Sequence, residues 1–243
     1  MRISGKTFSE KLAFCISNLE GFAVRPDETL MDWIDEVSPQ DARDLLVLWR
    51  NLFRNLLRVN GYQDYESRRL TQKFFDAGRR SPPWQPGSET GNRRPQDGAD
   101  GNRRSRWLFD QEHKFYAPEK IATLCEARYY LQTLSMEDAP SIPEKALERE
   151  FIVLLGHPLK PGEFLDPIQK IPVSFTRFIH DPRYVESGHL VPLGRGGRHT
   201  PDNATLMLRD SNRLQADLTI DELLETMIGI LVRHGYQVSR SSK

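Results

Sequence analysis

The chain has 243 residues, of which 38% are hydrophobic and 28% are charged, and its 34 basic side chains balance its 34 acidic ones. This length suits one large domain or two small ones, and the composition is ordinary for a soluble protein. No apolar run approaches the roughly 18 residues of a membrane span, and the first ten residues lack the apolar core of a signal peptide. We therefore expect a cytoplasmic protein that makes no use of a membrane.

Helices dominate the predicted N-terminal part. Ser9 can cap a first helix that runs to Phe22, because its apolar residues recur at near-helical spacing. The strongest helix prediction has Ser38 as N-cap and Pro39 at the first helical position, and it ends at Val59, before an Asn-Gly pair. A further helix is expected over 62–75.

Three arginines recur every four residues on the second of these helices, at Arg50, Arg54 and Arg58. This spacing places them on one helix face. The stripe is either an ordinary solvated face or a face that follows the phosphates of a nucleic acid.

Residues 78–106 are rich in Pro, Gly, Ser, Asn, Asp and Arg, and hold almost no aliphatic residue. Such a segment cannot bury enough apolar surface to offset its ordering entropy, so it predicts a flexible loop or linker. Its local excess of arginine is what contact with phosphates requires, although the whole chain is neutral. The candidates for DNA contact in this segment are Arg93, Arg94, Arg103 and Arg104.

Packed structure is expected to resume at Trp107, with helices over 118–135 and 143–155 and short extended pieces over 164–178. The two cysteines, Cys15 and Cys125, are far apart and belong to no Cys-x-x-Cys pair. They cannot form a four-cysteine zinc ribbon, so we expect no structural zinc, and small buried side chains are their ordinary interpretation.

The most informative segment is Ser187–Asp217, where a strand, a glycine-rich loop, a returning strand and a helix are predicted in that order. His189 lies near the end of the first strand, Thr205–Leu208 forms the second, and Asn212 lies on the helix. The loop contains three glycines that are expected to need positive φ: Gly194, Gly196 and Gly197. Such a unit places an imidazole, which can activate water, opposite oxygen atoms that can hold a metal. The simpler alternative is that these are turn and cap residues of an unrelated loop.

The order His, Pro, Gly-Gly, Asn and Asn-Arg in this segment resembles the HNH (ββα-metal) nucleases. The resemblance implies that His189 is the general base, that Asn203 fixes the loop, and that Asn212 completes the catalytic set as a metal ligand. Gly188 departs from the family pattern, because it stands where the usual metal-binding Asp would be. Another oxygen ligand is then needed. We favour Asp210, which shares a turn with Asn212, over Glu186 and Asp181.

The resemblance implies a metal-dependent DNA endonuclease that uses Mg²⁺, with Mn²⁺ as a substitute, and leaves 5′-phosphate and 3′-hydroxyl ends. The preferred hypothesis is sequence-specific restriction of foreign double-stranded DNA, because the chain is small, lacks a P-loop motif and has additional helices for recognition. A homing or phage-associated nuclease and a catalytically silent DNA-binding protein remain alternatives. One site per chain indicates a homodimer. The candidates for phosphate contact around the motif are Arg195, Arg198, Arg209 and Arg213.

The predicted fold class is α+β, with a mainly helical N-terminal region followed by a C-terminal ββα unit. The predicted divisions are a helical region over 1–77, a basic linker over 78–106, a second helical region over 107–160 and a nuclease domain over 161–243. A capping box formed by Thr219 and Glu222 predicts one more helix, which ends near His234. We expect this helix to pack on the ββα unit in place of a zinc ribbon.

Overall fold

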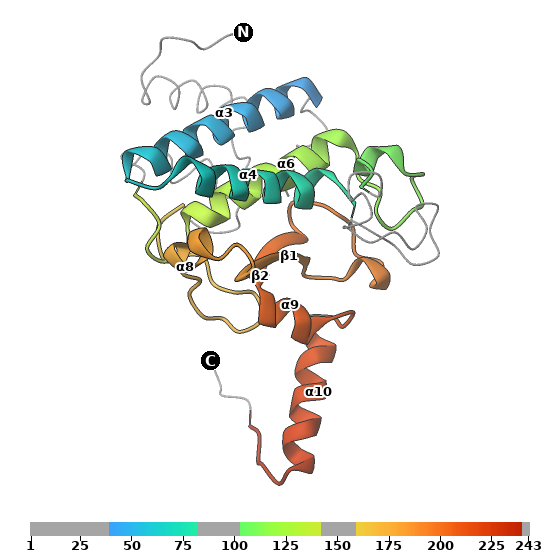
Figure 1. Cartoon of the computed structure of the whole chain (residues 1–243). Helices are drawn as coiled ribbons and strands as arrows, with labels where there is room; N and C mark the ends of the chain where they lie inside the picture. The colour runs from blue at the N-terminus through green and yellow to red at the C-terminus, as the bar shows by residue number, and fades with distance from the viewer. Residues whose placement is uncertain (1–38, 82–102, 142–158, 240–243) are drawn as a thin grey trace, which may run out of the picture.

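The computed structural model describes residues 39–81, 103–141 and 159–239 (Figure 1). Within these ranges the protein is a mixed α+β structure, with several helices and a small two-stranded antiparallel sheet. The helices predicted over 9–22 and 143–155 lie outside the described residues, as does the central part of the predicted linker.

Three helices form the upper part of the molecule: α3 (Pro39–Val59), α4 (Asp64–Arg79) and α6 (Glu119–Leu134) (Figure 1). All three were predicted from the sequence. The central helix is α6, in which every residue from 121 to 134 is buried, because α3 and α4 cover it on one side and the sheet covers it on another. Burial on all faces requires apolar or hydrogen-bonded side chains throughout the helix.

Aromatic side chains hold these helices together. The Phe74 and Tyr130 ring centroids lie 5.0 Å apart at 83°, and Phe53 meets Tyr130 at 5.2 Å and 71°. Edge-to-face packing of this kind aligns the positive edge of one ring with the negative face of the other. These rings belong to one hydrophobic core, which also includes residues of the sheet. The division of the chain into separate regions stays a prediction.

The arginine stripe on α3 connects helices. Arg50 Nη2 donates to Oε1 of the buried Glu126 on α6 at 2.8 Å, and Arg54 Nη2 donates to Thr71 Oγ1 on α4 at 3.1 Å. Arg50 and Arg54 therefore connect helices, and they belong neither to a solvated face nor to a face that follows phosphates. The carboxylate of Glu126 lies 76 positions from Arg50, so sequence spacing gives no sign of the pairing.

The segment over 164–178 is extended only at its beginning. Leu165 and Pro172 form an isolated antiparallel bridge, but α8 (Phe175–His180) is a short helix. Ser174 caps it by accepting a hydrogen bond from Arg177 N at 3.2 Å. The extended prediction is wrong here, because the side chains at 175, 178 and 179 share one buried helical face.

The small sheet and the helix after it follow the predicted order. β1 (Val185–His189) pairs with β2 (Ala204–Leu208) in antiparallel register, with Val185 opposite Leu208 and His189 opposite Ala204. α9 (Arg209–Gln215) begins directly after β2. Every residue of β2 is buried, because this strand packs against α6.

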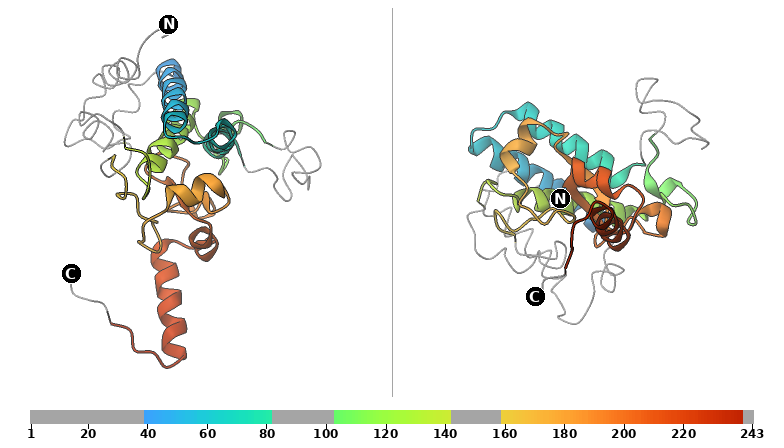
Figure 2. Two further views of the ribbon diagram at one scale, coloured as in Figure 1. Left: turned by 60° about the vertical axis from the view of Figure 1, so that its left-hand side comes forward. Right: turned by 90° about the horizontal axis from the view of Figure 1, so that it is seen from below.

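The last helix, α10 (Ile220–Arg233), begins with the predicted capping box. Thr219 Oγ1 accepts from Glu222 N at 3.2 Å, and Glu222 Oε2 accepts from Thr219 N at 2.9 Å. The expected packing on the preceding unit is limited to the start of the helix, where α10 meets α9, Leu223 is buried and Glu222 pairs with Arg195. Figures 1 and 2 show α10 projecting from the rest of the molecule. No helix in the described ranges has both the length and the apolar character needed to cross a membrane.

Candidate active site

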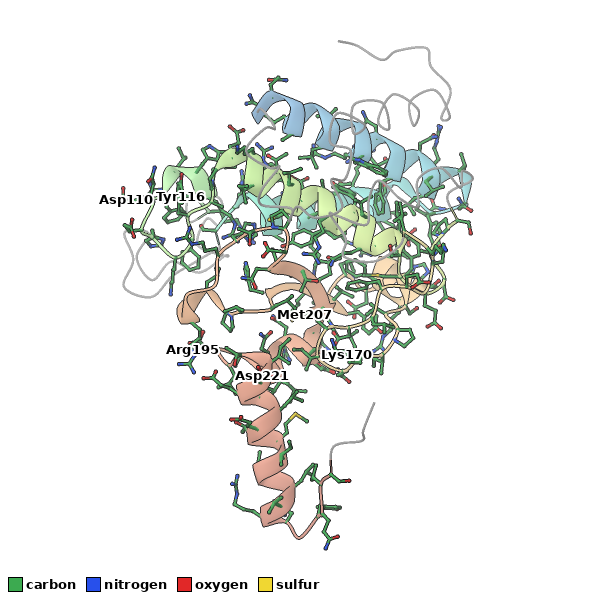
Figure 3. All side chains as sticks on the ribbon, turned by 180° about the vertical axis from the view of Figure 1, so that it is seen from behind. Asp110, Tyr116, Lys170, Arg195, Met207 and Asp221 are labelled. Carbon is green, nitrogen blue, oxygen red and sulfur yellow. The ribbon has the colours of Figure 1, made fainter. Side chains whose placement is uncertain are left out.

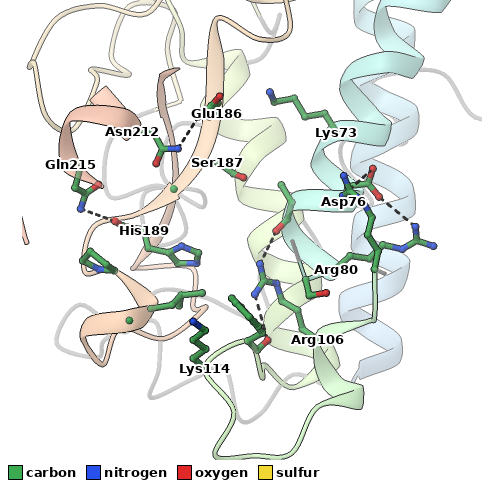
Figure 4. A pocket seen from close by; sticks show the side chains of 18 of the residues that line it. Lys73, Asp76, Arg80, Arg106, Lys114, Glu186, Ser187, His189, Asn212 and Gln215 are labelled. Atoms are coloured by element: carbon green, nitrogen blue, oxygen red, sulfur yellow. Dashed lines mark hydrogen bonds and ion pairs between the residues drawn. The ribbon is translucent and has the colours of Figure 1, made fainter. Parts of the chain in front are cut away.

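A cavity of about 980 Å³ opens between α4 and the unit formed by β1, α9 and the loop after β1 (Figure 4). Its walls carry six basic and three acidic side chains, although the whole chain has a net charge of zero. The basic ones are Arg69, Lys73, Arg80, Arg103, Arg106 and Lys114, and the acidic ones are Asp76, Glu186 and Asp217. The fold therefore concentrates positive charge in this cleft, which favours an anionic ligand.

His189 lines this cleft at the end of β1, and its hydrogen bonds define its tautomer. His189 Nε2 lies 2.9 Å from His199 Nδ1, and His199 Nε2 lies 2.7 Å from the carbonyl oxygen of Gly78. A carbonyl oxygen only accepts, so the proton of neutral His199 is on Nε2 and its Nδ1 accepts from His189. This arrangement leaves Nδ1 of His189 without a proton and able to take one.

Both imidazoles are held neutral. Burial, together with the nearby Arg106 guanidinium, lowers the pKa of His189 to about 3. The same two causes and the neighbouring His189 lower the pKa of His199 well below its usual range. Burial in a region of low polarity disfavours the charged form of each ring. The general base predicted at His189 is therefore unprotonated near neutral pH.

His199, which is 1% exposed, was not predicted to belong to the site. It lies ten residues after His189, at the end of the glycine-rich loop, while Gly78 lies 121 positions away on α4. The sequence near His199 offers one indication of its role, which is that a second histidine lies in the same loop. Its bond to the distant Gly78 carbonyl forms only in the folded chain.

Asn203 spans the loop between the two strands. Its Nδ2 donates to the carbonyl oxygens of Val191 at 3.0 Å and Arg198 at 2.7 Å, and its Oδ1 accepts from Val191 N at 2.7 Å. The side chain is buried, so these bonds are protected from competing water. They join the two ends of the loop that contains Pro192, and Asn203 acts on the site through the backbone.

The loop glycines have different roles. Gly196 has a φ of +84°, as predicted, but Gly194 and Gly197 do not have positive φ. A Cβ on Gly197 would lie 2.0 Å from the carbonyl oxygen of Val191, so this position needs glycine because two backbone segments meet closely there. The prediction of positive φ is therefore wrong for two of the three.

Asn212 meets a carboxylate, although a different one from that favoured by the sequence. Its Nδ2 donates to Glu186 Oε2 at 2.8 Å, and both side chains line the cleft (Figure 4). The side chain of Asp210 is 78% exposed, lies 3.7 Å from Arg209 and is not part of the cleft wall. Asp181, with a side chain that is 51% exposed, is not part of it either. The structure replaces Asp210 with Glu186 as the carboxylate beside Asn212.

Strand alternation explains this correction. Residues two apart on a strand point to the same face, so Glu186 shares a face of β1 with Gly188. A Cβ on Gly188 would lie 2.8 Å from Asn212 Oδ1 and 2.7 Å from the Met207 sulfur. Its backbone does not have positive φ, so a side chain here is opposed by the ends of the Met207 and Asn212 side chains, which would have to shift, and not by conformation.

The oxygen atoms at this position fit a hard divalent cation. Glu186 supplies a carboxylate, and Asn212 supplies an amide oxygen directed to the space beside Gly188. Among the described residues, no three His, Cys, Asp or Glu side chains gather into a metal-binding group. The donor set is therefore small and consists of oxygen, which suits Mg²⁺ that keeps several waters and shares the substrate's phosphate.

The arginines predicted to contact DNA are scattered. Arg103 lines the cleft and lies 3.5 Å from Asp76, whereas Arg104 lies over the Phe109 ring. Of those around the motif, Arg195 pairs with Glu222 and Arg209 with Asp210. Two more, Arg198 and Arg213, are exposed and are not part of the cleft wall. The remaining two, Arg93 and Arg94, lie outside the described ranges.

Half of the basic wall of the cleft, namely Arg80, Arg103 and Arg106, comes from the predicted basic linker over 78–106, and the other half was not predicted to contact DNA. Lys73 on α4 donates to the carbonyl oxygen of Pro182 at 2.6 Å, and burial lowers the pKa of its ammonium group despite the nearby Glu186 and Asp181 carboxylates. Arg106 is 4% exposed and donates to two backbone carbonyls. Lys73 and Arg106 converge because α4 and the end of the predicted linker pack beside β1 (Figure 4).

No family model matches this chain, and no curated protein matches it. Among solved structures, it is similar to one described as "Crystal structure of a type II restriction endonuclease", with a TM-score of 0.42 and 23% sequence identity. The similarity covers 50% of this chain and 55% of that chain, so the match spans about half the length of each.

Proposed function

We propose that this protein is a divalent-cation-dependent endonuclease that hydrolyses phosphodiester bonds in double-stranded DNA. The observation that carries this proposal is the hydrogen-bonded series His189, His199 and Gly78, which leaves Nδ1 of His189 free to accept a proton. His189 lines a basic cleft that also contains Glu186 and Asn212. A base, oxygen ligands for a cation and an electropositive surface are the parts that phosphodiester hydrolysis needs.

In the proposed reaction, Nδ1 of His189 takes a proton from the water that attacks phosphorus, and its Nε2–H stays bonded to His199. Such general-base assistance is worth about 10² to 10⁴ in rate. Glu186 and Asn212 would hold Mg²⁺, which when bound stabilises negative charge on the phosphate and on the leaving 3′ oxygen. The products would carry 5′-phosphate and 3′-hydroxyl ends.

The low pKa of His189 suits this role only when substrate is present. A phosphate beside the ring favours the imidazolium form and raises its pKa, whereas Arg106 lowers it in the free protein. DNA bound along Lys73, Arg80 and Lys114 would therefore strengthen the base as it arrives. Asn203 supports the reaction by fixing the loop after His189.

Within this activity, we place restriction of foreign DNA ahead of a homing or phage-associated nuclease, because the additional helices offer a surface for sequence recognition. A catalytically silent DNA-binding protein is the competing hypothesis, and Gly188 favours it. The position of Glu186 beside Asn212 supports the nuclease instead, since the same strand face still presents a carboxylate.

Cleavage of supercoiled plasmid and phage DNA with Mg²⁺ or Mn²⁺ tests the proposal, with His189→Ala as the inactive variant. His234→Ala is the matched control, because His234 caps the exposed end of α10 outside the cleft. We expect discrete bands from the wild type and the control and uncut DNA from His189→Ala at unchanged DNA affinity. Mg²⁺-dependent cleavage by His189→Ala at more than a tenth of the wild-type rate would remove the base assignment.

Calorimetric titration with Mg²⁺ separates the nuclease from the silent module. The wild type should bind Mg²⁺ at a site that Glu186→Gln weakens, because a neutral amide replaces a charged oxygen ligand. A wild-type protein that binds DNA, cuts nothing and shows no site-specific heat with Mg²⁺ would support the silent module.

A further inference from the structure

Arg106 is a buried cation on the wall of the cleft. It lines the cavity together with His189, yet it is only 4% exposed. In Figure 4 it lies across the cleft from His189. Burial and the charge of Arg106 together lower the pKa of both His189 and His199, so this guanidinium acts on both imidazoles. No step of the proposed reaction uses the charge directly.

The hydrogen bonds of Arg106 leave much of its donor capacity unused. Nη1 donates to the carbonyl oxygen of Phe115 and Nη2 to that of Ala77, both at 3.4 Å. N–H···O bonds are usually about 2.7–3.2 Å long, so these two are weak. Nε is buried and has no hydrogen-bond partner among the described residues. A guanidinium has five N–H donors, so most of them remain available to a ligand.

Within the described ranges, no carboxylate compensates the charge of Arg106. Burial lowers its pKa, and the groups that oppose this effect are Tyr129 and Cys125. Burial raises the pKa of both groups, so neither carries a negative charge near neutral pH. Asp110, the next carboxylate along the chain, is exposed and lies at the edge of the molecule in Figure 3.

Two other arginines of the cleft differ from Arg106 in this respect. Arg80 and Arg103 lie 3.6 Å and 3.5 Å from Asp76, which compensates their charge. Removing an unpaired charge from water is unfavourable, so the folded protein gains when a ligand supplies the opposite charge. The fork of a guanidinium matches two oxygen atoms of a phosphate group. The missing counter-charge therefore indicates a phosphate that enters the cleft.

We propose that Arg106 binds a phosphate group at the wall of the cleft opposite His189, and that this group belongs to a DNA backbone. The anion site rests on the burial and bonding of Arg106 alone, whereas its occupation by DNA rests on the proposed function. The cavity of about 980 Å³ is far larger than one phosphate ion, and Lys73 and Lys114 also line it. Several cations in one cleft favour a chain of phosphates over a single ion.

Calorimetric titration with inorganic phosphate, without metal or DNA and at constant ionic strength, tests the anion site. The wild type should bind phosphate, and Arg106→Met should weaken this binding at least about tenfold, because methionine lacks the charge and the donors. Arg106→Lys keeps the charge but loses the fork, so its affinity should lie between the two. Arg103→Met is the matched control. Arg103 lines the same cleft but is paired with Asp76, so phosphate affinity should stay within about threefold.

Thermal unfolding separates a ligand-binding arginine from a structural one. Without phosphate, Arg106→Met should melt at the temperature of the wild type or above it, because an apolar side chain removes the cost of burying an unpaired charge. With phosphate at about ten times its Kd, the wild type should gain about 3–6 °C and the variant nothing. A wild type that gains no stability from phosphate overturns the proposal, and so does phosphate binding that Arg106→Met leaves unchanged.

A short DNA duplex in EDTA identifies the occupant. Its affinity should fall about tenfold in Arg106→Met, and inorganic phosphate should compete with it for the wild type. If phosphate binds at Arg106 but the duplex binds wild type and variant equally, the site takes free phosphate and its assignment to DNA is overturned.

Failure of the nuclease hypothesis gives a different result. A protein that cuts no DNA with any divalent cation could still bind phosphate at Arg106, and the titration would show this. Conversely, Arg106→Met that cleaves DNA and binds phosphate as the wild type does would keep the nuclease and reject the anion site.

Discussion

Replacing His199 with phenylalanine should show whether the proposed activity depends on the fixed tautomer of His189 or only on the presence of His189 in the cleft. Phenylalanine keeps the ring and the burial, but it neither accepts from His189 Nε2 at 2.9 Å nor donates to the carbonyl of Gly78 at 2.7 Å. Two buried polar groups then lose their partners, at about 1–3 kcal/mol each. We expect a less stable protein that still folds, because the rest of the loop is held by Asn203.

The rate should fall further than the loss of stability explains. Residues that orient a catalytic or ligating histidine typically contribute about 10- to 100-fold in activity, so kcat for the folded fraction of His199→Phe should drop within this range. His199→Gln offers an amide oxygen that accepts from His189, and it should recover part of the rate. The assay is single-turnover plasmid nicking with Mg²⁺, well below the melting temperature of each variant.

A purely structural role for His199 predicts a different outcome. Folded His199→Phe would then cleave within about twofold of the wild type, and His199→Gln would offer no advantage. Nitrogen NMR of the wild-type imidazoles gives a second check, independent of activity. A proton found on Nδ1 of His189, in place of Nε2, would refute the tautomer assignment.

Further predictions concern the metal site, the strand and pH. In calorimetry, Glu186→Gln should weaken Mg²⁺ binding at least about tenfold, because Glu186 lies beside Asn212. Asp210→Asn changes an exposed side chain and should leave Mg²⁺ affinity within about twofold of the wild type. If Asp210→Asn had the larger effect, Asp210 would be the ligand. Gly188→Ala should cost about 1–3 kcal/mol in urea unfolding, because its Cβ meets Met207, and an unchanged midpoint would contradict the packing. The pKa of His189 is about 3, below its ordinary 6.5, so the neutral ring stabilises the folded protein. This stabilisation is complete above pH 6.5 and is lost as pH falls toward 3. A melting temperature that stays constant between about pH 8 and pH 5 would contradict this.

The elements that local sequence determines were predicted well. The end of α3 at Val59, before Asn60-Gly61, and the Thr219 capping box of α10 depend on residues within one turn, and both were confirmed. The strand, loop, strand and helix that carry His189 and Asn212 were predicted from spacing within about thirty residues. The features that were not predicted from the sequence depend on contacts between residues far apart along the chain. The bond of Arg50 to Glu126 joins separate helices, and the basic wall of the cleft forms only when α4 packs beside β1.

The choice of Asp210 over Glu186 as metal ligand stays a prediction, but its spatial premise does not hold. Closeness to Asn212 in sequence was taken as closeness in space, but the first turn of α9 directs Asp210 outward, with its side chain 78% exposed. The alternation of side chains along β1 contained the answer, because Glu186 lies two residues before Gly188. The apolar stripe of α10 was recognised correctly, but among the described residues it is buried only at Leu223.

The bond from His199 to Gly78 has a mechanical consequence. Gly78 lies near the end of α4, where a Cβ would come within 2.7 Å of Glu126 Cβ, so this wall is seated directly on the central helix. The loop that carries His199 belongs to the opposite wall. If the two walls separated at this end, His199 would lose its acceptor, and nothing would then hold the proton of His189 on Nε2. Under the proposed function, a distortion that loosens α4 at this corner would therefore free the proton of His189 to move between its two ring nitrogens.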